Sequence, residues 1–250
     1  MSQKLLETLS TFINEERGRY ETEHNNIFAF SVGQIVRYYQ FTLITFDKYQ
    51  KANKNFMEII ETQKQSFKEG SGVISKEQME LLNKSAEITL YLHLEIESFY
   101  QFAKILLDKI ANAIELYFGQ VRKKPLDSHD DMAKNFDAYT GEKKLKKILK
   151  LDELIKKLKK DISDYRDYKI SHQKSPRVIK ATVFAGGKTR MSITKIYPSE
   201  EEQQELREDL ETKFLDELKL DLETYIEYVI EFIKTNKAKT NLRLEAKQKM

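Results

Sequence analysis

The 250-residue chain contains no cysteine, only three prolines and only eight glycines. The lack of cysteine excludes disulfides, thiolate zinc sites and cysteine nucleophiles. It also suits a reducing cytoplasm, which is the location we expect. Turn-rich β folds use more glycine and proline than this chain has. The composition therefore predicts an all-α protein built from long helices.

Long apolar runs and a strong net charge are also lacking. The longest apolar-looking runs, at 25–36 and 98–103, are shorter than the roughly 18 residues that a membrane span needs, and the N-terminal segment has no apolar core typical of a signal peptide. Lysine and arginine total 43 against 40 acidic residues, which gives a net charge of +3. We therefore expect no membrane association, and the overall charge alone indicates no nucleic-acid partner.

The residues that are present predict a bundle of amphipathic helices. Ser75 and Gln78 form a capping-box pattern, and Gly119 is a helix stop. The segment 98–118 is apolar nearly all round, which indicates a helix surrounded by partners. The helices expected from these patterns span 2–18, 24–67, 76–118, about 143–172, and a last segment that opens at Ser199.

The remaining segments predict smaller features within a single domain, residues 1–237. Residues 120–142 are expected to be a loop or short helical pieces. Two β-branched runs around Ala185-Gly186-Gly187 predict a small β-hairpin insertion near 177–197. Residues 238–250 are polar and basic, and we expect them to be a disordered tail. The last helix carries an apolar stripe with helical spacing at Leu206, Leu210, Phe214, Leu218, Leu222, Tyr225, Val229 and Ile233.

Common metal and phosphate sites have no matching motif. The four histidines show no H-x-x-x-H spacing, and His129-Asp130-Asp131 is interpreted as a solvated loop. The glycine pairs lack the strand, lysine and helix that surround a phosphate-binding loop. We therefore expect no metal and no cofactor.

The stretch 143–160, KKLKKILKLDELIKKLKK, has nine lysines against two acidic residues. Such a face attracts phosphates without sequence preference, because binding releases counterions. Many helical bundles also carry a lysine-rich face for solubility alone. Both interpretations stay open for this stretch.

The basic stretch leads into Arg166-Asp167…His172, close to Pro176, where the helix is expected to end. A histidine exchanges protons near neutral pH, and a guanidinium can bind two phosphate oxygens at once. The two groups meet the minimum for cutting RNA without a metal, with His172 as general acid or base and Arg166 as transition-state stabiliser. On a straight α-helix they lie about 9 Å and about 240° apart, so they converge only if the helix ends there. The simpler alternative is that Arg166 pairs with a nearby aspartate and His172 caps the helix.

The R-D-x-x-x-x-H pattern at the end of a late helix resembles the motif of the HEPN superfamily. The helix LEIESFYQFAKILLDKIANAIELYFG resembles the core helix of bacterial HEPN-type proteins, so the likeness covers residues 76–175. The hairpin and the helix 24–67 lie outside the family's minimal bundle. Many family members are metal-independent ribonucleases that place two such motifs face to face in a homodimer.

The resemblance implies an endoribonuclease that acts through attack of the 2′-hydroxyl. Arg166 and His172 would be its catalytic pair, and Asp167 would orient one of them. RNA phosphates would be contacted by Lys159, Lys160, Lys169, Lys174 and Arg177. Two other hypotheses remain. One is a non-catalytic module that binds RNA, a nucleotide or a protein partner, as an antitoxin does. The other is a helical scaffold, against which the all-round apolar segment 98–118 argues.

Overall fold

The computed structural model describes residues 2–68, 74–171, 177–183, 189–195 and 215–245. In chain order its elements are α1 (Ser2–Arg17), α2 (Thr22–Lys68), α3 (Lys76–Phe118), α4 (His129–Glu142), α5 (Leu149–Leu158), the π-helix η1 (Lys159–Ser171), β1 (Arg177–Val183), β2 (Thr189–Lys195), α7 (Leu215–Thr235) and the 3₁₀-helix η2 (Lys237–Lys239). The predicted all-α class is confirmed. In the segment where the hairpin is expected, β1 and β2 pair antiparallel, with Ile179 opposite Ile193.

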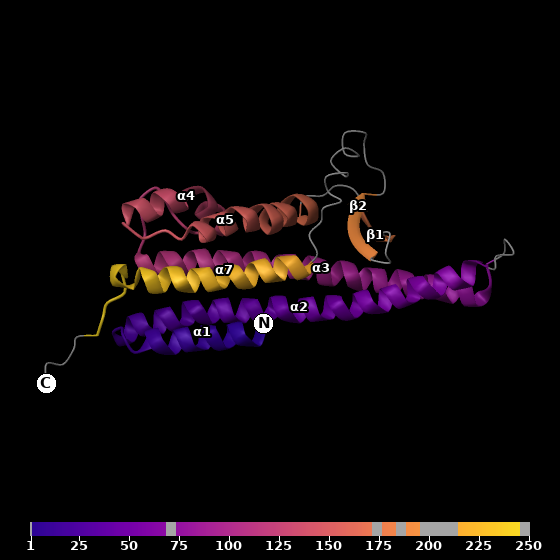
Figure 1. The fold of residues 1–250 in the computed structure, drawn as a ribbon, viewed down its shortest axis with the longest axis horizontal. Helices are drawn as coiled ribbons and strands as arrows, with labels where there is room; N and C mark the ends of the chain where they lie inside the picture. Colours follow the sequence, from indigo (N-terminus) through magenta and orange to yellow (C-terminus); the bar gives the residue numbers. More distant parts are fainter. Residues whose placement is uncertain (1, 69–73, 172–176, 184–188, 196–214, 246–250) are drawn as a thin grey trace.

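The two longest helices, α2 and α3, lie antiparallel and form the central helix pair, against which the other helices pack (Figure 1). The predicted capping box is present, because Ser75 Oγ accepts the Gln78 N–H at 3.2 Å and Gln78 Oε1 accepts the Ser75 N–H at 2.9 Å. Aromatic rings join the two helices, for example Phe46 and Phe99 with centroids 6.2 Å apart. Beyond the other helices, the two continue together as an arm that contains the C-terminal end of α2 and the N-terminal end of α3 (Figure 1).

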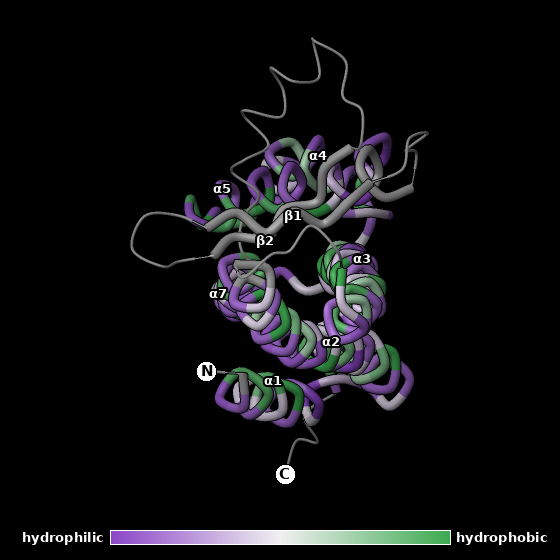
Figure 2. Tube along the Cα trace, turned by 90° about the vertical axis from the view of Figure 1, so that its right-hand side faces the viewer, coloured by the Kyte–Doolittle hydropathy of each residue, from purple (hydrophilic) through white to green (hydrophobic). Residues whose placement is uncertain are grey.

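The other helices cover α2 and α3 from two sides. Viewed along the long axis, α1 lies on one side, α4 and α5 lie on the other, and α7 lies between them beside α3 (Figure 2). The predicted apolar stripe of α7 is buried from Leu218 to Ile233, whereas Leu206, Leu210 and Phe214 lie outside the described residues. Tyr39 of α2 donates a hydrogen bond to the buried carboxylate of Glu223 on α7 at 2.8 Å.

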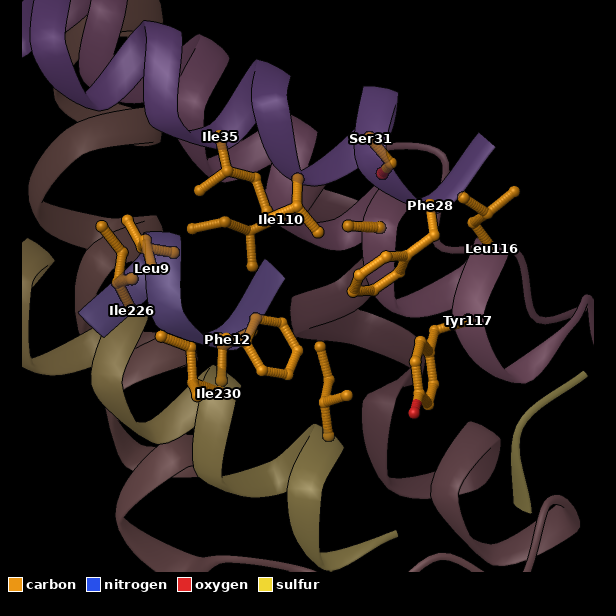
Figure 3. Close-up of a pocket in the computed structure, with 14 residues that line it drawn as sticks. Leu9, Phe12, Phe28, Ser31, Ile35, Ile110, Leu116, Tyr117, Ile226 and Ile230 are labelled. Carbon is orange, nitrogen blue, oxygen red and sulfur yellow. The ribbon is translucent and has the colours of Figure 1, made fainter. Parts of the chain in front are cut away.

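The apolar interior is tightly packed where α1, α2, α3 and α7 meet. Figure 3 shows the side chains that surround a small cavity there, among them Phe12, Phe28 and Ile110. The cavity volume is about 20 Å³, which is close to the space needed for a single water molecule. Because its lining is almost entirely apolar, this space is a packing defect of the core.

Residues 120–142 differ from their prediction, since 129–142 form a complete helix, α4. Ser128 is its N-cap and accepts the Asp131 N–H at 3.1 Å. The carboxylate of Asp108 on α3 accepts a hydrogen bond from a second N–H group of the helix start, that of His129, at 2.8 Å. Satisfying these orphan N–H groups stabilises a helix start, and one of the two acceptors comes from a distant part of the sequence.

The predicted helix over 143–172 is also wrong in its start and its geometry. Lys144 has a φ of 54°, which turns the chain out of the helix, and α5 begins only at Leu149. The intervening backbone is held by Asn236, whose amide accepts the Lys146 N–H at 2.7 Å and donates to the Lys146 carbonyl at 3.0 Å. These bonds to the end of α7 replace the helical bonds of the first turn.

From Lys159 to Ser171 the helix is a π-helix instead of an α-helix. Its hydrogen bonds run from residue i to residue i+5 and place more residues in each turn. The ion pair between Lys159 and Asp164, five residues apart, is 2.8 Å long and fits this spacing. Ile162 and Ser163 are buried, and Tyr165 stacks on Tyr100 of α3, so contacts with the bundle favour the wider helix.

The prediction of a disordered tail is wrong for residues 238–245. Asn241 N–H donates to the Tyr117 carbonyl at 2.7 Å, and Leu242 is buried. Leu244 forms a β-bridge with Tyr20. Residues 246–250 lie outside the described residues, but the segment before them is packed onto the helical domain.

None of the described helices is long and apolar enough to cross a membrane.

Candidate functional site

Arg166 lies on η1 and faces α3. Its Nε donates a hydrogen bond to Oε1 of Gln101 at 3.1 Å, and the side chain is partly buried. One edge of the guanidinium is therefore fixed by a neutral partner on the central helix. A guanidinium binds anions through charge-assisted hydrogen bonds.

A pair of stacked tyrosines supports the same part of η1. Tyr100 and Tyr165 have ring centroids 4.4 Å apart and an interplanar angle of 22°. Burial raises the pKa of Tyr100 well above its usual range, with smaller contributions from nearby negative groups, so the phenol is neutral. Because Tyr165 directly precedes Arg166, this stack fixes the backbone that carries the arginine.

The remaining candidate catalytic residues are placed only in part. Asp167 and Lys169 are backbone positions on η1, and Arg177 is the first residue of β1. His172 and Lys174 lie outside the described residues. The pairing of Arg166 with His172 therefore stays a prediction.

The π-helical winding changes how the motif spacing is interpreted. The separation of about 240° holds only for an α-helix, and 166–171 are not α-helical. A bond from residue i to residue i+5 stacks position 171 over position 166. Position 171 lies on the same face of the helix as Arg166, one turn farther along, and the next residue, His172, lies outside the described residues.

The lysine-rich face is only partly available for phosphates. Lys159 pairs with Asp164, and Lys156, Lys157 and Lys147 pair with other aspartates. Such pairs at the surface contribute little stability and exchange readily. Lys160 is exposed and forms no ion pair within the described part of the chain, so it is the least constrained of the predicted phosphate contacts on this helix.

A buried polar cluster around His129 was missed from the sequence, where 129–131 were interpreted as a solvated loop. The His129 ring is fully buried and lies edge-on to Tyr225, with centroids 5.7 Å apart. Burial, followed by the positive charges of Lys104 and Lys159, lowers the pKa of His129 to about 3. Lys104 pairs with Asp108 at 2.8 Å. The S-x-x-D pattern of Ser128 and Asp131 is the sequence signal that identifies this helix start.

This cluster is structural in its chemistry. A histidine that stays neutral at every physiological pH cannot alternate between acid and base. Among the described residues, no group of three or more histidine and acidic side chains is arranged to hold a metal ion. Of the sites described here, only the Arg166 region combines partial exposure, positive charge and a rigid support.

The fold and this region define an all-α helical protein with an anchored arginine at the end of a basic helix. The chain matches no protein-family model, no curated protein and no solved structure. Its resemblance to the HEPN superfamily therefore rests on the sequence motif alone.

Proposed function

We propose that the protein is a metal-independent, HEPN-like endoribonuclease whose catalytic pair is Arg166 and His172. The observation that carries the proposal is the anchoring of Arg166 through Nε to Gln101, on a π-helical segment that ends one residue before the histidine. π-helical turns are found frequently at functional sites. A guanidinium held in place is preorganised for the charge that builds on a phosphodiester.

In the proposed reaction, His172 takes the proton of the 2′-hydroxyl or gives one to the leaving 5′-oxygen. The 2′-oxygen attacks phosphorus, the bond to the 5′-oxygen breaks, and the product is a 2′,3′-cyclic phosphate. Arg166 stabilises the negative oxygens on phosphorus, and Asp167 orients one member of the pair. Lys159, Lys160, Lys169, Lys174 and Arg177 bind the RNA backbone.

A homodimer in the cytoplasm completes the proposal, because two copies would bring two arginines and two histidines to one groove. The alternative is a non-catalytic module that binds RNA, a nucleotide or a protein partner such as a toxin or antitoxin. The ion pairs of Lys156, Lys157 and Lys159 reduce the positive field for RNA, which favours a protein partner over RNA within this alternative.

The test is cleavage of a labelled single-stranded RNA by the purified protein in excess EDTA. We expect a 2′,3′-cyclic phosphate end and no cleavage of a substrate with a 2′-deoxy nucleotide at the cut. Arg166→Ala and His172→Ala should each lower the rate by about a hundredfold or more. The matched control is Arg122→Ala, an exposed arginine just beyond the C-terminal end of α3, which should leave the rate unchanged.

The outcomes separate the two functions. Cleavage that survives His172→Ala rules out the assigned general acid or base. RNA binding without cleavage, weakened by Arg166→Ala, supports the non-catalytic module. Sedimentation of the same samples reports whether the active species is a dimer.

A further inference from the structure

A second site lies at the end of the bundle opposite the arm, where an open cleft of about 670 Å³ is formed between α2, α3, the segment after α3 and Asn241 of the C-terminal segment. We call it the Phe30 cleft. Its volume is within the usual range of small-molecule sites. Ser31 and Leu116, labelled in Figure 3, line both this cleft and the small core cavity, so the floor of the cleft is continuous with the apolar interior.

One wall of the Phe30 cleft is apolar and open to solvent. Phe30 is 69% exposed and Ile27 is 39% exposed, and both contribute to this wall. An exposed aromatic face inside a concave site gives an apolar or cationic group a surface to pack against.

The opposite wall presents hydrogen-bond acceptors. The Asn112 amide donates both to the Asp108 carbonyl at 2.8 Å and to the Asp127 carbonyl at 3.2 Å, so its oxygen is the atom left to accept. Asp127 is exposed, and its carboxylate adds negative charge. No lysine, arginine or histidine of the described residues lines the cleft. This wall therefore favours a ligand that donates hydrogen bonds and disfavours a phosphate.

Glu115 supplies the second observation that points to a ligand. Only 7% of this residue is exposed, and its Oε1 accepts the Leu126 N–H at 3.0 Å. No cation of the described residues forms an ion pair with Glu115, although Lys143 Nζ lies near Gly119 and Asn241, which both line the cleft. Glu115 lines the cleft, so a positive group of a ligand in the cleft can form a charge-assisted hydrogen bond with this carboxylate.

We infer that the Phe30 cleft binds a small organic cation, an amine, amidine or guanidine attached to an apolar body. The cation interacts with Glu115 and Asp127, and the apolar body packs on Phe30. Glu115 lies 14 residues from Gln101 along α3, about 21 Å at the helical rise. The inference is therefore independent of the proposed ribonuclease site.

Titration calorimetry with three isosteric probes tests the inference on the full chain. Benzamidine is a cation, benzamide is neutral and benzoate is an anion of similar shape. We expect benzamidine to bind at least about tenfold more tightly than benzamide, because charge-assisted hydrogen bonds to two carboxylates are the stronger kind. Benzoate should not bind.

Variants locate the site. Asp127→Asn and Phe30→Ala should each weaken benzamidine about fivefold or more, as should Glu115→Gln, which keeps an acceptor for the Leu126 N–H. Asp47→Asn, an exposed aspartate on α2, is the matched control and should have no effect. Less than tenfold discrimination between benzamidine and benzamide overturns the inference. So does unchanged affinity in Asp127→Asn, a surface variant whose folding is confirmed by circular dichroism.

Discussion

The imidazole of His129 is the residue whose surroundings most clearly decide its chemistry. Both ring nitrogens are buried without a hydrogen-bond partner in the described part of the molecule. Adding a proton there would place a charge in an apolar setting beside two lysines, which explains the direction of its pKa. The unfolded chain has no such barrier, so His129 takes up a proton more readily when the protein unfolds.

We predict that His129→Leu removes part of the acid sensitivity of the protein. The folded pKa of about 3 lies below the ordinary value of 6.5. Above pH 6.5 the imidazole is therefore neutral in both the folded and the unfolded protein, and its full contribution to the free energy of unfolding is present. It is lost as pH falls toward 3, by about 1.4 kcal/mol per unit. Urea unfolding of both proteins at pH 7, 6 and 5 should show a shallower decline in the variant. Met132→Leu, a buried swap of similar volume in the same helix, should keep the parent's slope. Equal slopes for His129→Leu and the parent would contradict the assignment.

At the residue scale, the sequence identifies side chains by chemistry but not their partners. Arg166 is recognisable from its motif, yet its partner Gln101 is 65 residues away and has no distinguishing pattern. From the sequence alone, His129 could be a metal ligand or an exposed residue of a loop. Its burial becomes visible only when α3, α4 and α7 are packed together.

At the scale of single elements, α1, α2 and α3 could be predicted closely. Their apolar spacing is regular, and Ser75 and Gly119 mark the ends of α3 by well-understood physics. The π-helix could not be predicted, because the shift from i+4 to i+5 bonding arises from the contacts of Ile162 and Tyr165 with the bundle. The start of α5 was missed for a similar reason, since Asn236 takes the backbone groups of Lys146.

Ser75 and Ser128 are both N-caps, but replacing each with alanine should affect global stability differently. Ser75 lies near the tip of the arm, whereas Ser128 lies within the bundle. Ser75→Ala removes the cap of α3, where Met79 and Leu82 are 47% and 37% exposed. We expect local fraying, with hydrogen exchange of residues 76–82 about fivefold faster, and a change below about 0.5 kcal/mol in global stability.

Ser128→Ala removes the cap of α4 next to buried His129. It should lower the global free energy of unfolding by about 1 kcal/mol. Urea unfolding followed by circular dichroism, together with hydrogen exchange by mass spectrometry, measures both responses. An equal loss of global stability in the two variants would show that the arm unfolds together with the bundle.

At the scale of the whole molecule, the all-α class follows from composition, and the arrangement of its layers does not. The C-terminal segment is the clearest case. Its polar composition is typical of a disordered tail, yet residues 240–245 bond to backbone groups of Arg19 and Glu21, in the turn between α1 and α2, and of Tyr117, near the C-terminal end of α3. Such bonds use main-chain atoms that every residue carries, so they cannot be predicted from a pattern of side chains in the sequence.

The closing segment should therefore contribute to global stability through one side chain. Leu242 is 5% exposed and packs onto the core, whereas Leu244, two residues later, is 54% exposed. Leu242→Ala should lower the free energy of unfolding by about 2 kcal/mol or more, from lost burial and the cavity left behind. Leu244→Ala removes the same atoms from the surface and should change it by less than about 0.5 kcal/mol. Urea unfolding of the two variants beside the parent measures the difference. Similar small losses in both would mean that residues 240–245 detach before the bundle unfolds, because a segment already released in the folded protein has no burial to lose.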